Sequence, residues 1–177
     1  MKFIVLDRDG VINKDSDQFI KTPDEWAPIP GALEAIAKLN QAGWRVVVAS
    51  NQSGVGRGLF GMDMLNAING RMIESLAQVG GRLDAVFFCP HAADSTCDCR
   101  KPKPGLLRQI QARFNVDLAG VPIVGDSLRD LQAGVALGCA PYLVLTGKGE
   151  KTRDENELPA DTQIFPDLAA VVDSLLD

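Results

Sequence analysis

The sequence lacks any long hydrophobic run and any excess of basic residues. Its first apolar run, Phe3–Leu6, is far shorter than a signal peptide or a membrane-spanning helix requires. Acidic residues outnumber basic residues by 23 to 18, and the resulting net charge of −5 disfavours a surface that binds nucleic acid non-specifically. Internal repeats and low-complexity segments are also absent. These absences predict a protein without a membrane or nucleic-acid partner.

The length and composition are those of one globular domain. A chain of 177 residues is long enough to bury a sizeable core. Its hydrophobic content of 46% and charged content of 23% are ordinary for such a domain. We therefore expect a single domain over residues 1–177, and we expect a monomer.

Histidine and cysteine are scarce, and the few that occur are concentrated. The single histidine and three of the four cysteines fall within eleven residues, in the order Cys89, His91, Cys97 and Cys99. Two close pairs of soft ligands can complete a tetrahedral zinc site, which would be structural because four protein ligands leave no position for substrate. The alternatives are buried thiols beside a surface histidine, or a disulfide. Thiols committed to a metal favour the cytoplasm, whereas Cys139 lies among apolar residues and is expected to pack in the core.

Short apolar segments alternate with amphipathic segments of helical length. Strands are expected at Lys2–Leu6, Trp44–Ala49, Leu83–Phe88, Val121–Val124 and Tyr142–Leu145. Helices are expected at Gly31–Gln41, Met62–Val79, Pro104–Phe114, Leu128–Leu137 and about 167–176. This alternation predicts an α/β fold, a Rossmann-like arrangement of three layers in which helices cover both faces of a parallel sheet. The polar segment Lys148–Asp161 is expected to be an exposed loop.

Two carboxylates follow the first expected strand. Asp7 comes directly after Leu6, and Asp9 follows two residues later, before Gly10. Ligands of open parallel sheets bind outside the carboxyl ends of the strands, so both side chains are well placed for chemistry. Two close carboxylates repel each other unless one is protonated or a cation lies between them, and Mg²⁺ prefers such oxygen ligands. The alternative is a simple turn in which Gly10 provides the bend.

Polar residues at the ends of later strands favour the catalytic interpretation. The second strand is followed by Ser50-Asn51-Gln52-Ser53-Gly54, and the fourth by Gly125-Asp126-Ser127 and then Asp130. Between them, Arg100-Lys101-Pro102-Lys103-Pro104 opens a helix. An acid, a hydroxyl, a lysine and a second acid thus occur in order at or near successive strand ends. The glycine-rich run Gly54–Gly58 is weaker, and we interpret it as a loop that leads into the next helix.

Together these motifs resemble those of the haloacid dehalogenase superfamily of phosphatases. The resemblance rests on Asp7-x-Asp9-Gly10, Ser50, Lys101 and Gly125-Asp126-x-x-x-Asp130. Cys89-Pro-His91 and Cys97-Asp-Cys99-Arg100-Lys101-Pro102 add a similarity to a zinc-bearing branch that holds heptose-bisphosphate and histidinol-phosphate phosphatases. Residues 51–58 match the heptose pattern, since histidinol-phosphate phosphatases tend to have Asn-Gln-Asp-Gly there. The short zinc loop, in contrast, is closer to the histidinol type.

The resemblance implies a magnesium-dependent phosphatase that removes the C7 phosphate of a heptose 1,7-bisphosphate, in the synthesis of activated heptose for lipopolysaccharide. Asp7 would attack phosphorus to form a phospho-aspartate, and Asp9 would serve as general acid and then general base. Lys101 and Ser50 would stabilise charge on the phosphoryl oxygens. The implied Mg²⁺ ligands are Asp7, the main-chain carbonyl of Asp9, and Asp126. Asp130 would support the loop that carries Asp126.

The resemblance also implies recognition of the substrate without a cap domain, because the two usual insertion segments are filled by expected helices and strands. The zinc loop would instead act as a small lid. Arg100 would bind the second phosphate, the alternative being a surface ion pair with Asp98. The other expected substrate contacts are Arg8, Asp15, Ser16, Asp17, Gln18, Asn51, Gln52 and Ser53. For residues 15–18 the alternative is a solvated loop.

Two other functions fit parts of the sequence. One is a histidinol-phosphate phosphatase, as the nearest relative in the same branch. The other is a non-catalytic zinc-binding module on the same scaffold, which would leave the aspartates, Ser50 and Lys101 without a role. Mg²⁺-dependent release of phosphate from a simple ester separates an enzyme from such a module.

Overall fold

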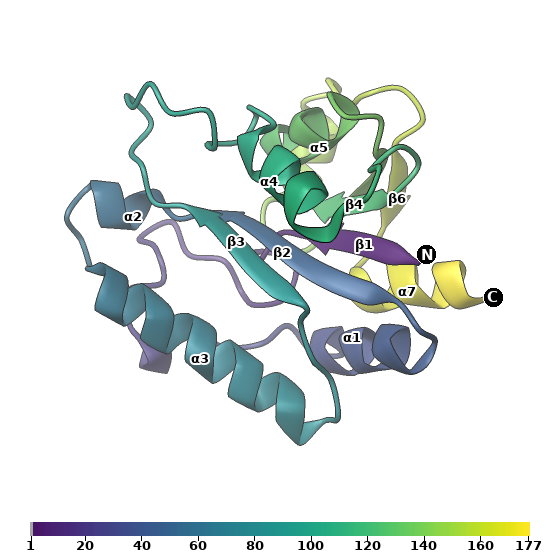
Figure 1. Ribbon diagram of the computed structural model, residues 1–177, viewed down its shortest axis with the longest axis horizontal. Coiled ribbons are helices and arrows are strands. Elements are labelled where there is room, and N and C mark those ends of the chain that lie inside the picture. Colours follow the sequence, from purple (N-terminus) through teal and green to yellow (C-terminus); the bar gives the residue numbers. More distant parts are fainter. Residues whose placement is uncertain (1) are drawn as a thin grey trace.

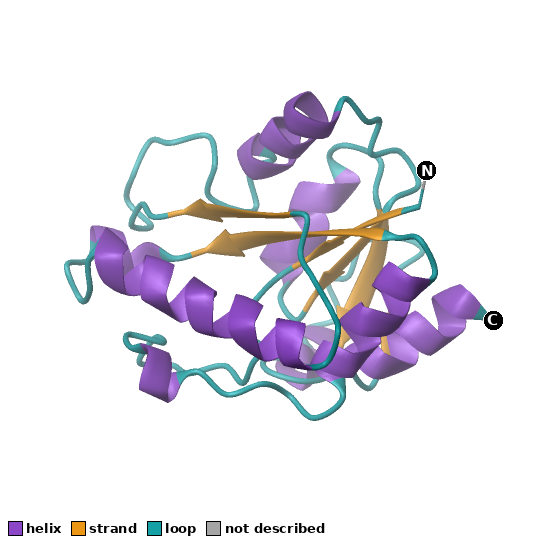
Figure 2. Cartoon of the chain, turned by 60° about the horizontal axis from the view of Figure 1, so that its bottom comes forward, coloured by secondary structure: helices purple, strands orange, loops and turns teal. Residues whose placement is uncertain are grey.

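The structure is a computed structural model that describes residues 2–177 and has an α/β fold (Figures 1 and 2). Six parallel strands form one sheet in the order β3-β2-β1-β4-β5-β6, which confirms the predicted parallel sheet. The strands are β1 (Phe3–Leu6), β2 (Arg45–Asn51), β3 (Ala85–Cys89), β4 (Pro122–Gly125), β5 (Ala140–Val144) and β6 (Gln163–Phe165). The helices are α1 (Ala32–Gln41), α2 (Ser53–Gly56), α3 (Met62–Gln78), α4 (Gly105–Phe114), α5 (Leu128–Val135), α6 (Gly149–Asp154) and α7 (Leu168–Leu176), with a 3₁₀ helix η1 (Pro23–Glu25).

Alternate residues of the central strands supply the two halves of the core. Ile4 and Leu6 of β1 belong to a cluster with apolar residues of α1, α3 and α7. Phe3 and Val5 belong to a second cluster with residues of α4 and α5. Successive side chains of a strand point to opposite faces, so an almost wholly apolar strand serves both clusters. Figure 1 shows α4 and α5 on one side of the sheet and α1 and α3 on the other.

The position of β1 in the middle of the sheet decides where the functional groups meet. Leu6 pairs with Val48 of β2 on one side and with Val124 of β4 on the other. From β1 the sheet continues through β2 to β3 on one side, and through β4 to β5 and β6 on the other. The direction in which strands are added therefore reverses at β1. Ligands of α/β sheets bind at such a switch point, beyond the carboxyl ends of the strands.

The prediction of a loop over Lys148–Asp161 is wrong in part, because this segment contains α6. The only buried residues of α6 are Gly149 and Thr152. Neither has a large apolar side chain, so the sequence shows no apolar periodicity that would indicate a helix here. Strand β6 and helix α2 were also not predicted. Each has only three or four residues, and neither is a continuous run of buried apolar residues like β1.

The two segments that could hold a cap domain are occupied by elements of the main domain. The chain between β1 and β2 contains η1 and α1, and the chain between Ser50 and Lys101 contains α2, α3 and β3. Across residues 2–177, no helix has both the length and the apolar character needed to cross a bilayer.

Candidate active site

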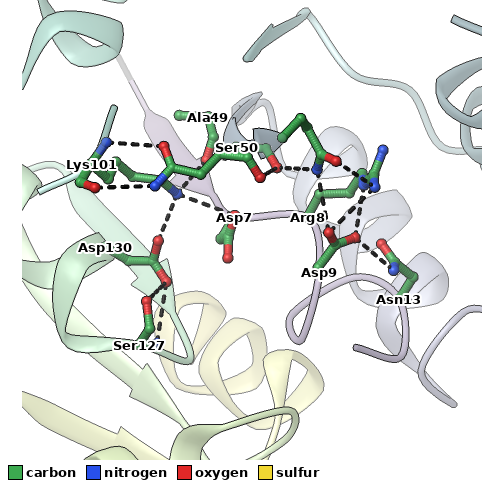
Figure 3. A network of polar contacts seen from close by, with 11 residues as sticks. Asp7, Arg8, Asp9, Asn13, Ala49, Ser50, Lys101, Ser127 and Asp130 are labelled. Carbon is green, nitrogen blue, oxygen red and sulfur yellow. Dashed lines mark hydrogen bonds and ion pairs between the residues drawn. The ribbon is translucent and has the colours of Figure 1, made fainter. Parts of the chain in front are cut away.

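Three carboxylates, those of Asp7, Asp126 and Asp130, meet Lys101 at the carboxyl end of β1. Figure 3 shows Asp7, Asp130 and Lys101 of this cluster. The N–H of Asp7 donates to Val124 O at 3.0 Å and so continues the pairing of β1 with β4. Asp7, Asp126 and Asp130 each place a carboxylate oxygen within 4.8 Å of the others. Lys101 Nζ lies 3.1 Å from Asp7 Oδ1 and 2.6 Å from Asp130 Oδ1. The fold thus brings together side chains that are 94 positions apart in the sequence.

Lys101 is held by its backbone as well as by its ammonium group. Its Nζ donates to Ala49 O at 2.7 Å. The side chain of Asn51 accepts from Lys101 N–H at 2.9 Å and donates to Lys101 O at 3.1 Å. Burial acts to lower the pKa of Lys101, but the charges of Asp130 and Asp7 outweigh it and raise the pKa above its ordinary value. The ammonium group therefore keeps its charge at neutral pH.

Negative charge exceeds positive charge in this cluster. Burial, followed by the charge of Asp130, raises the pKa of Asp7 well above its ordinary value, while Lys101 acts in the opposite direction. Burial and Asp130 also raise the pKa of Asp126 to about 7. A bound cation relieves such repulsion, and a set of carboxylate oxygens suits Mg²⁺. The residues present therefore fit this metal.

Asp9 lies beside the cluster in its own hydrogen-bond network (Figure 3). Its Oδ1 accepts from Arg8 Nε and Asn13 Nδ2, both at 2.9 Å, and its Oδ2 accepts from Gln52 Nε2 at 3.3 Å. Burial acts to raise the pKa of Asp9, but the charge and hydrogen bonds of Arg8 outweigh it, and the pKa is lowered. Arg8 is 1% exposed and also donates to Asn69 Oδ1 at 3.0 Å. Its guanidinium group is therefore engaged entirely within the protein.

A cavity of about 160 Å³ opens over these groups. Most of the expected site residues line it, namely Asp7, Asp9, Asp15, Ser16, Asp17, Asn51, Ser53, Arg100, Lys101 and Asp126. Four of the expected residues do not contribute to its lining, namely Arg8, Gln18, Ser50 and Gln52. Ser50 and Gln52 lie behind the cavity wall, where Gln52 Nε2 donates to Ser50 Oγ at 2.7 Å. Gln18 lies on a separate surface depression beside Lys21.

Three residues that the sequence analysis did not single out also line the cavity. Arg129 lies in the first turn of α5, three residues after Asp126. Lys148 pairs with Asp15 at 3.2 Å, and the ring of Phe19 lies under the guanidinium group of Arg57 at 5.6 Å. For Arg129, the sequence offered one signal that it could line the site. It follows Asp126 by three residues, and the first turn of a helix after a strand such as β4 faces the switch point of the sheet.

The cysteines and the histidine form one compact cluster beyond β3. His91 Nδ1 lies 3.3 Å from the sulfur atoms of both Cys89 and Cys99, and the sulfur atoms of Cys89 and Cys97 are 3.7 Å apart. All four ligand atoms lie within 4.8 Å of one another, and the cysteines are not disulfide-bonded. A tetrahedral zinc ion with bonds of about 2.3 Å to sulfur holds its ligands roughly 3.5–3.8 Å apart. The donor set and spacing therefore fit zinc. Cys139 is buried in the core, as expected.

The Cys89–Cys99 loop is hydrogen-bonded to α2 and to the start of α4. Its first half binds α2, where Gly56 N–H donates to Pro90 O at 2.8 Å. Its second half binds the start of α4, where Gly105 N–H donates to Asp98 O at 3.0 Å and Lys103 Nζ donates to Cys97 O at 2.9 Å. Arg100 and Lys101 follow this loop directly, so its conformation sets their positions.

Known proteins share this architecture over its full length. Residues 2–131 match the family model described as polynucleotide kinase 3 phosphatase, and residues 98–175 match the HAD-hydrolase-like model. The D-glycero-beta-D-manno-heptose-1,7-bisphosphate 7-phosphatase of Bordetella bronchiseptica is 60% identical over 99% of this chain and 98% of its own. The chain belongs to this family of HAD-like phosphatases. A second 7-phosphatase, from Pseudomonas aeruginosa, is 55% identical over 98% of this chain and 97% of its own.

A solved structure from this family has the same fold as this chain. The D,D-heptose 1,7-bisphosphate phosphatase from B. bronchiseptica, solved with magnesium and phosphate, superimposes with a TM-score of 0.98 at 60% identity and covers 99% of this chain and 98% of its own. The resemblance to the haloacid dehalogenase superfamily, and within it to the heptose-bisphosphate phosphatases, is thereby confirmed.

Proposed function

We propose that the protein hydrolyses the C7 phosphate of D-glycero-β-D-manno-heptose 1,7-bisphosphate with the help of Mg²⁺, in the synthesis of activated heptose. The observation that carries this proposal is the cluster of Asp7, Lys101 and Asp126 at the switch point of the sheet. The relatives named for this activity support the choice of substrate and of the β anomer. The test compares kcat/KM for the β and α bisphosphates and for histidinol phosphate, and we expect the β bisphosphate to be preferred.

In the proposed mechanism Asp7 attacks phosphorus in line and becomes a phospho-aspartate. Despite burial, Arg8 keeps the pKa of Asp9 low in the substrate-free protein, but a negatively charged phosphate bound beside Asp9 favours its protonated form. Asp9 then takes up a proton from solvent and passes it to the leaving sugar oxygen. Asp9 then takes a proton from the water that hydrolyses the intermediate, and such assistance contributes about 10²–10⁴ in rate. Lys101 Nζ, fixed by Ala49 O, stabilises charge on the phosphoryl oxygens. Ser50 acts with it. Mg²⁺, held by the Asp7 carboxylate, the Asp9 carbonyl and Asp126, supplies positive charge that keeps Asp7 ionised and neutralises the phosphoryl group.

We propose a different role for Arg8 from the substrate contact expected at first. Its guanidinium group is buried and bonded to Asp9, Gln52 and Asn69, so it has no free donor directed to the cavity. Arg8 and Gln52 instead hold the Asp9 carboxylate in place beside Asp7. Asp15, Ser16 and Asp17 line the cavity and are proposed to contact hydroxyl groups of the sugar.

Arg100 is proposed to bind the second phosphate, together with Arg129. Both line the cavity, and the Nη1 atom of Arg100 is buried without a hydrogen-bond partner within residues 2–177. Burial, followed by the charge of Arg129, lowers the pKa of Arg100. A phosphate bound between the two guanidinium groups would satisfy the free donor and offset their repulsion.

Replacement of Arg100 by alanine is expected to lower kcat/KM for the bisphosphate by about 10- to 100-fold, mainly through KM, because it removes charged hydrogen bonds to a group remote from the reaction. The kcat/KM of the same variant for a heptose 7-phosphate, which lacks the C1 phosphate, should change little. Steady-state kinetics with both substrates measures the difference, and Arg113→Ala, an exposed position on α4, is the control. Equal losses with both substrates would contradict this role.

The raised pKa of Asp126 predicts how the effect of Mg²⁺ on stability depends on pH. The pKa rises from 3.8 to about 7 in the folded protein, so ionisation of Asp126 destabilises the metal-free fold progressively as pH increases through this range. Mg²⁺ removes this repulsion, whereas at low pH it must displace a proton. Differential scanning fluorimetry should therefore show a larger Mg²⁺-induced rise in Tm at about pH 8 than at about pH 5.5. An equal rise at both pH values would contradict the assignment of Asp126 as a ligand.

Zinc is proposed to occupy the Cys89, His91, Cys97 and Cys99 cluster as a structural ion that shapes one side of the cavity. We further propose that the protein is a single domain that acts as a monomer in the cytoplasm. The commitment of three reduced thiols to a metal supports that compartment. Light scattering of the purified protein tests the oligomeric state.

A further inference from the structure

Two threonine hydroxyls connect the loops that carry the catalytic aspartates, and the mechanism above does not use them. Thr146 follows β5, and its Oγ1 donates to Gly10 O at 2.7 Å, in the loop that begins with Asp7. Thr152 lies in α6, and its Oγ1 donates to Asp126 O at 2.8 Å. Thr152 is 6% exposed, so its hydroxyl acts in a buried setting. The segment from Thr146 to Thr152 therefore binds both loops.

The backbone of this segment also touches the Asp126 carboxylate. Lys148 N–H donates to Asp126 Oδ2 at 2.9 Å. Gly147 packs so closely that a Cβ atom there would collide with Asp126 Oδ2 and would lie 2.6 Å from Gly10 Cα. A Cβ atom on Gly10 would collide with the same carboxylate. The carboxylate of Asp126 thus lies between two backbone segments whose separation Thr146 sets.

The hydrogen bond of Thr152 is unusual for a helical threonine. Such a hydroxyl commonly bonds back to the carbonyl four residues earlier, and Lys148 O does lie 3.0 Å away. The hydroxyl of Thr152 lies nearer to Asp126 O, which belongs to another element of the fold. This contact ties α6 to the main chain of Asp126.

We propose that Thr146 and Thr152 are positioning residues that set the relative placement of the Asp7–Gly10 loop and of Asp126, and thereby the affinity for the divalent cation. The inference rests on the proposed function, in which Asp7 and Asp126 hold Mg²⁺. Groups that orient metal ligands typically change metal affinity or activity by about 10- to 100-fold when they are removed. A hydroxyl that only satisfied a buried carbonyl would change stability and leave metal affinity unchanged.

The test uses valine and serine at each position. Thr146→Val and Thr152→Val keep the shape and remove the hydroxyl, whereas Thr146→Ser and Thr152→Ser keep the hydroxyl. Thr162→Val is the matched control, because Thr162 Oγ1 donates to Pro159 O at 2.7 Å in a loop that does not line the cavity. Isothermal titration calorimetry with Mg²⁺ or Mn²⁺, in the absence of substrate, measures affinity, and circular dichroism measures folding.

We expect the valine variants to bind the cation about 10-fold or more weakly than the wild type, and the serine and Thr162→Val variants to bind it normally. Turnover of the valine variants should recover at high Mg²⁺. Valine variants with unchanged affinity would overturn the inference. A loss of affinity in the folded serine variants would overturn it as well, even if the valine variants fail to fold. Absence of cation binding by the wild type would overturn the proposed metal site itself, which is a distinguishable result.

Discussion

Replacement of Asp7 by asparagine should reduce turnover by about 10⁴-fold or more while leaving the fold intact. The amide cannot attack phosphorus, and it removes one of the charges proposed to hold Mg²⁺. Burial and the charge of Asp130 raise the pKa of Asp7, so its ionised form is costly in the metal-free protein. The variant should therefore melt at the same temperature as the metal-free wild type or above it. Single-turnover assays and Tm measurements check both parts.

Asp24→Asn is the control for this experiment, because Asp24 is exposed in η1 and outside the lining of the cavity. It makes the same chemical change and should keep full activity. A phosphorylated Asp7→Asn protein, or activity within about tenfold of the wild type, would contradict the assignment of Asp7 as the nucleophile.

Removal of zinc should lower kcat/KM by roughly 100-fold even when Mg²⁺ is saturating. Lys101 lies two residues after Cys99, and a displacement of about 1 Å in a catalytic group can cost about 10² in rate. Cys97→Ser removes one thiolate and also disturbs the loop whose Cys97 carbonyl accepts from Lys103 Nζ. The sheet has its own core on both faces, so we expect local disorder without unfolding. Metal analysis, kinetics and circular dichroism measure the three quantities.

Cys139→Ala provides the matched control for the zinc experiment. Cys139 is the one cysteine outside the cluster and packs in the core beside α4 and α5. This variant should lose some stability but should keep about one zinc ion and normal kcat/KM. Freshly prepared wild-type protein without zinc, or a zinc-free enzyme with full activity, would contradict the coupling between the loop and the active site.

Local patterns were sufficient to predict the strands that build the active site. β1, β2 and β4 appear in the sequence as short apolar runs, because both faces of a parallel sheet are covered and most of their residues are buried. The residues that follow such strands must meet at one edge, so Asp7, Asn51 and Asp126 were identified as a site. The four candidate zinc ligands needed no tertiary information either, because they fall within eleven consecutive residues.

Supporting residues could not be predicted in this way. From its place between two aspartates, Arg8 was predicted to contact the substrate. Its guanidinium group instead points into the protein, where it donates hydrogen bonds to the side chains of Asn69 in α3 and of Gln52. Helix α6 has no apolar stripe, and its purpose is visible only when Thr152 is seen beside Asp126. A polar contact between distant segments leaves no periodic trace in the sequence.

The sequence by itself determined the class of fold, the catalytic motifs and the candidate zinc ligands, because each depends on spacing within a short stretch or on the ends of apolar strands. Only the tertiary structure decided which polar side chains face the cavity, which hold the aspartates in place, and how strongly their charges interact. Those properties depend on distances between residues such as Lys101 and Asp7, which are 94 positions apart in the chain and 3.1 Å apart in space.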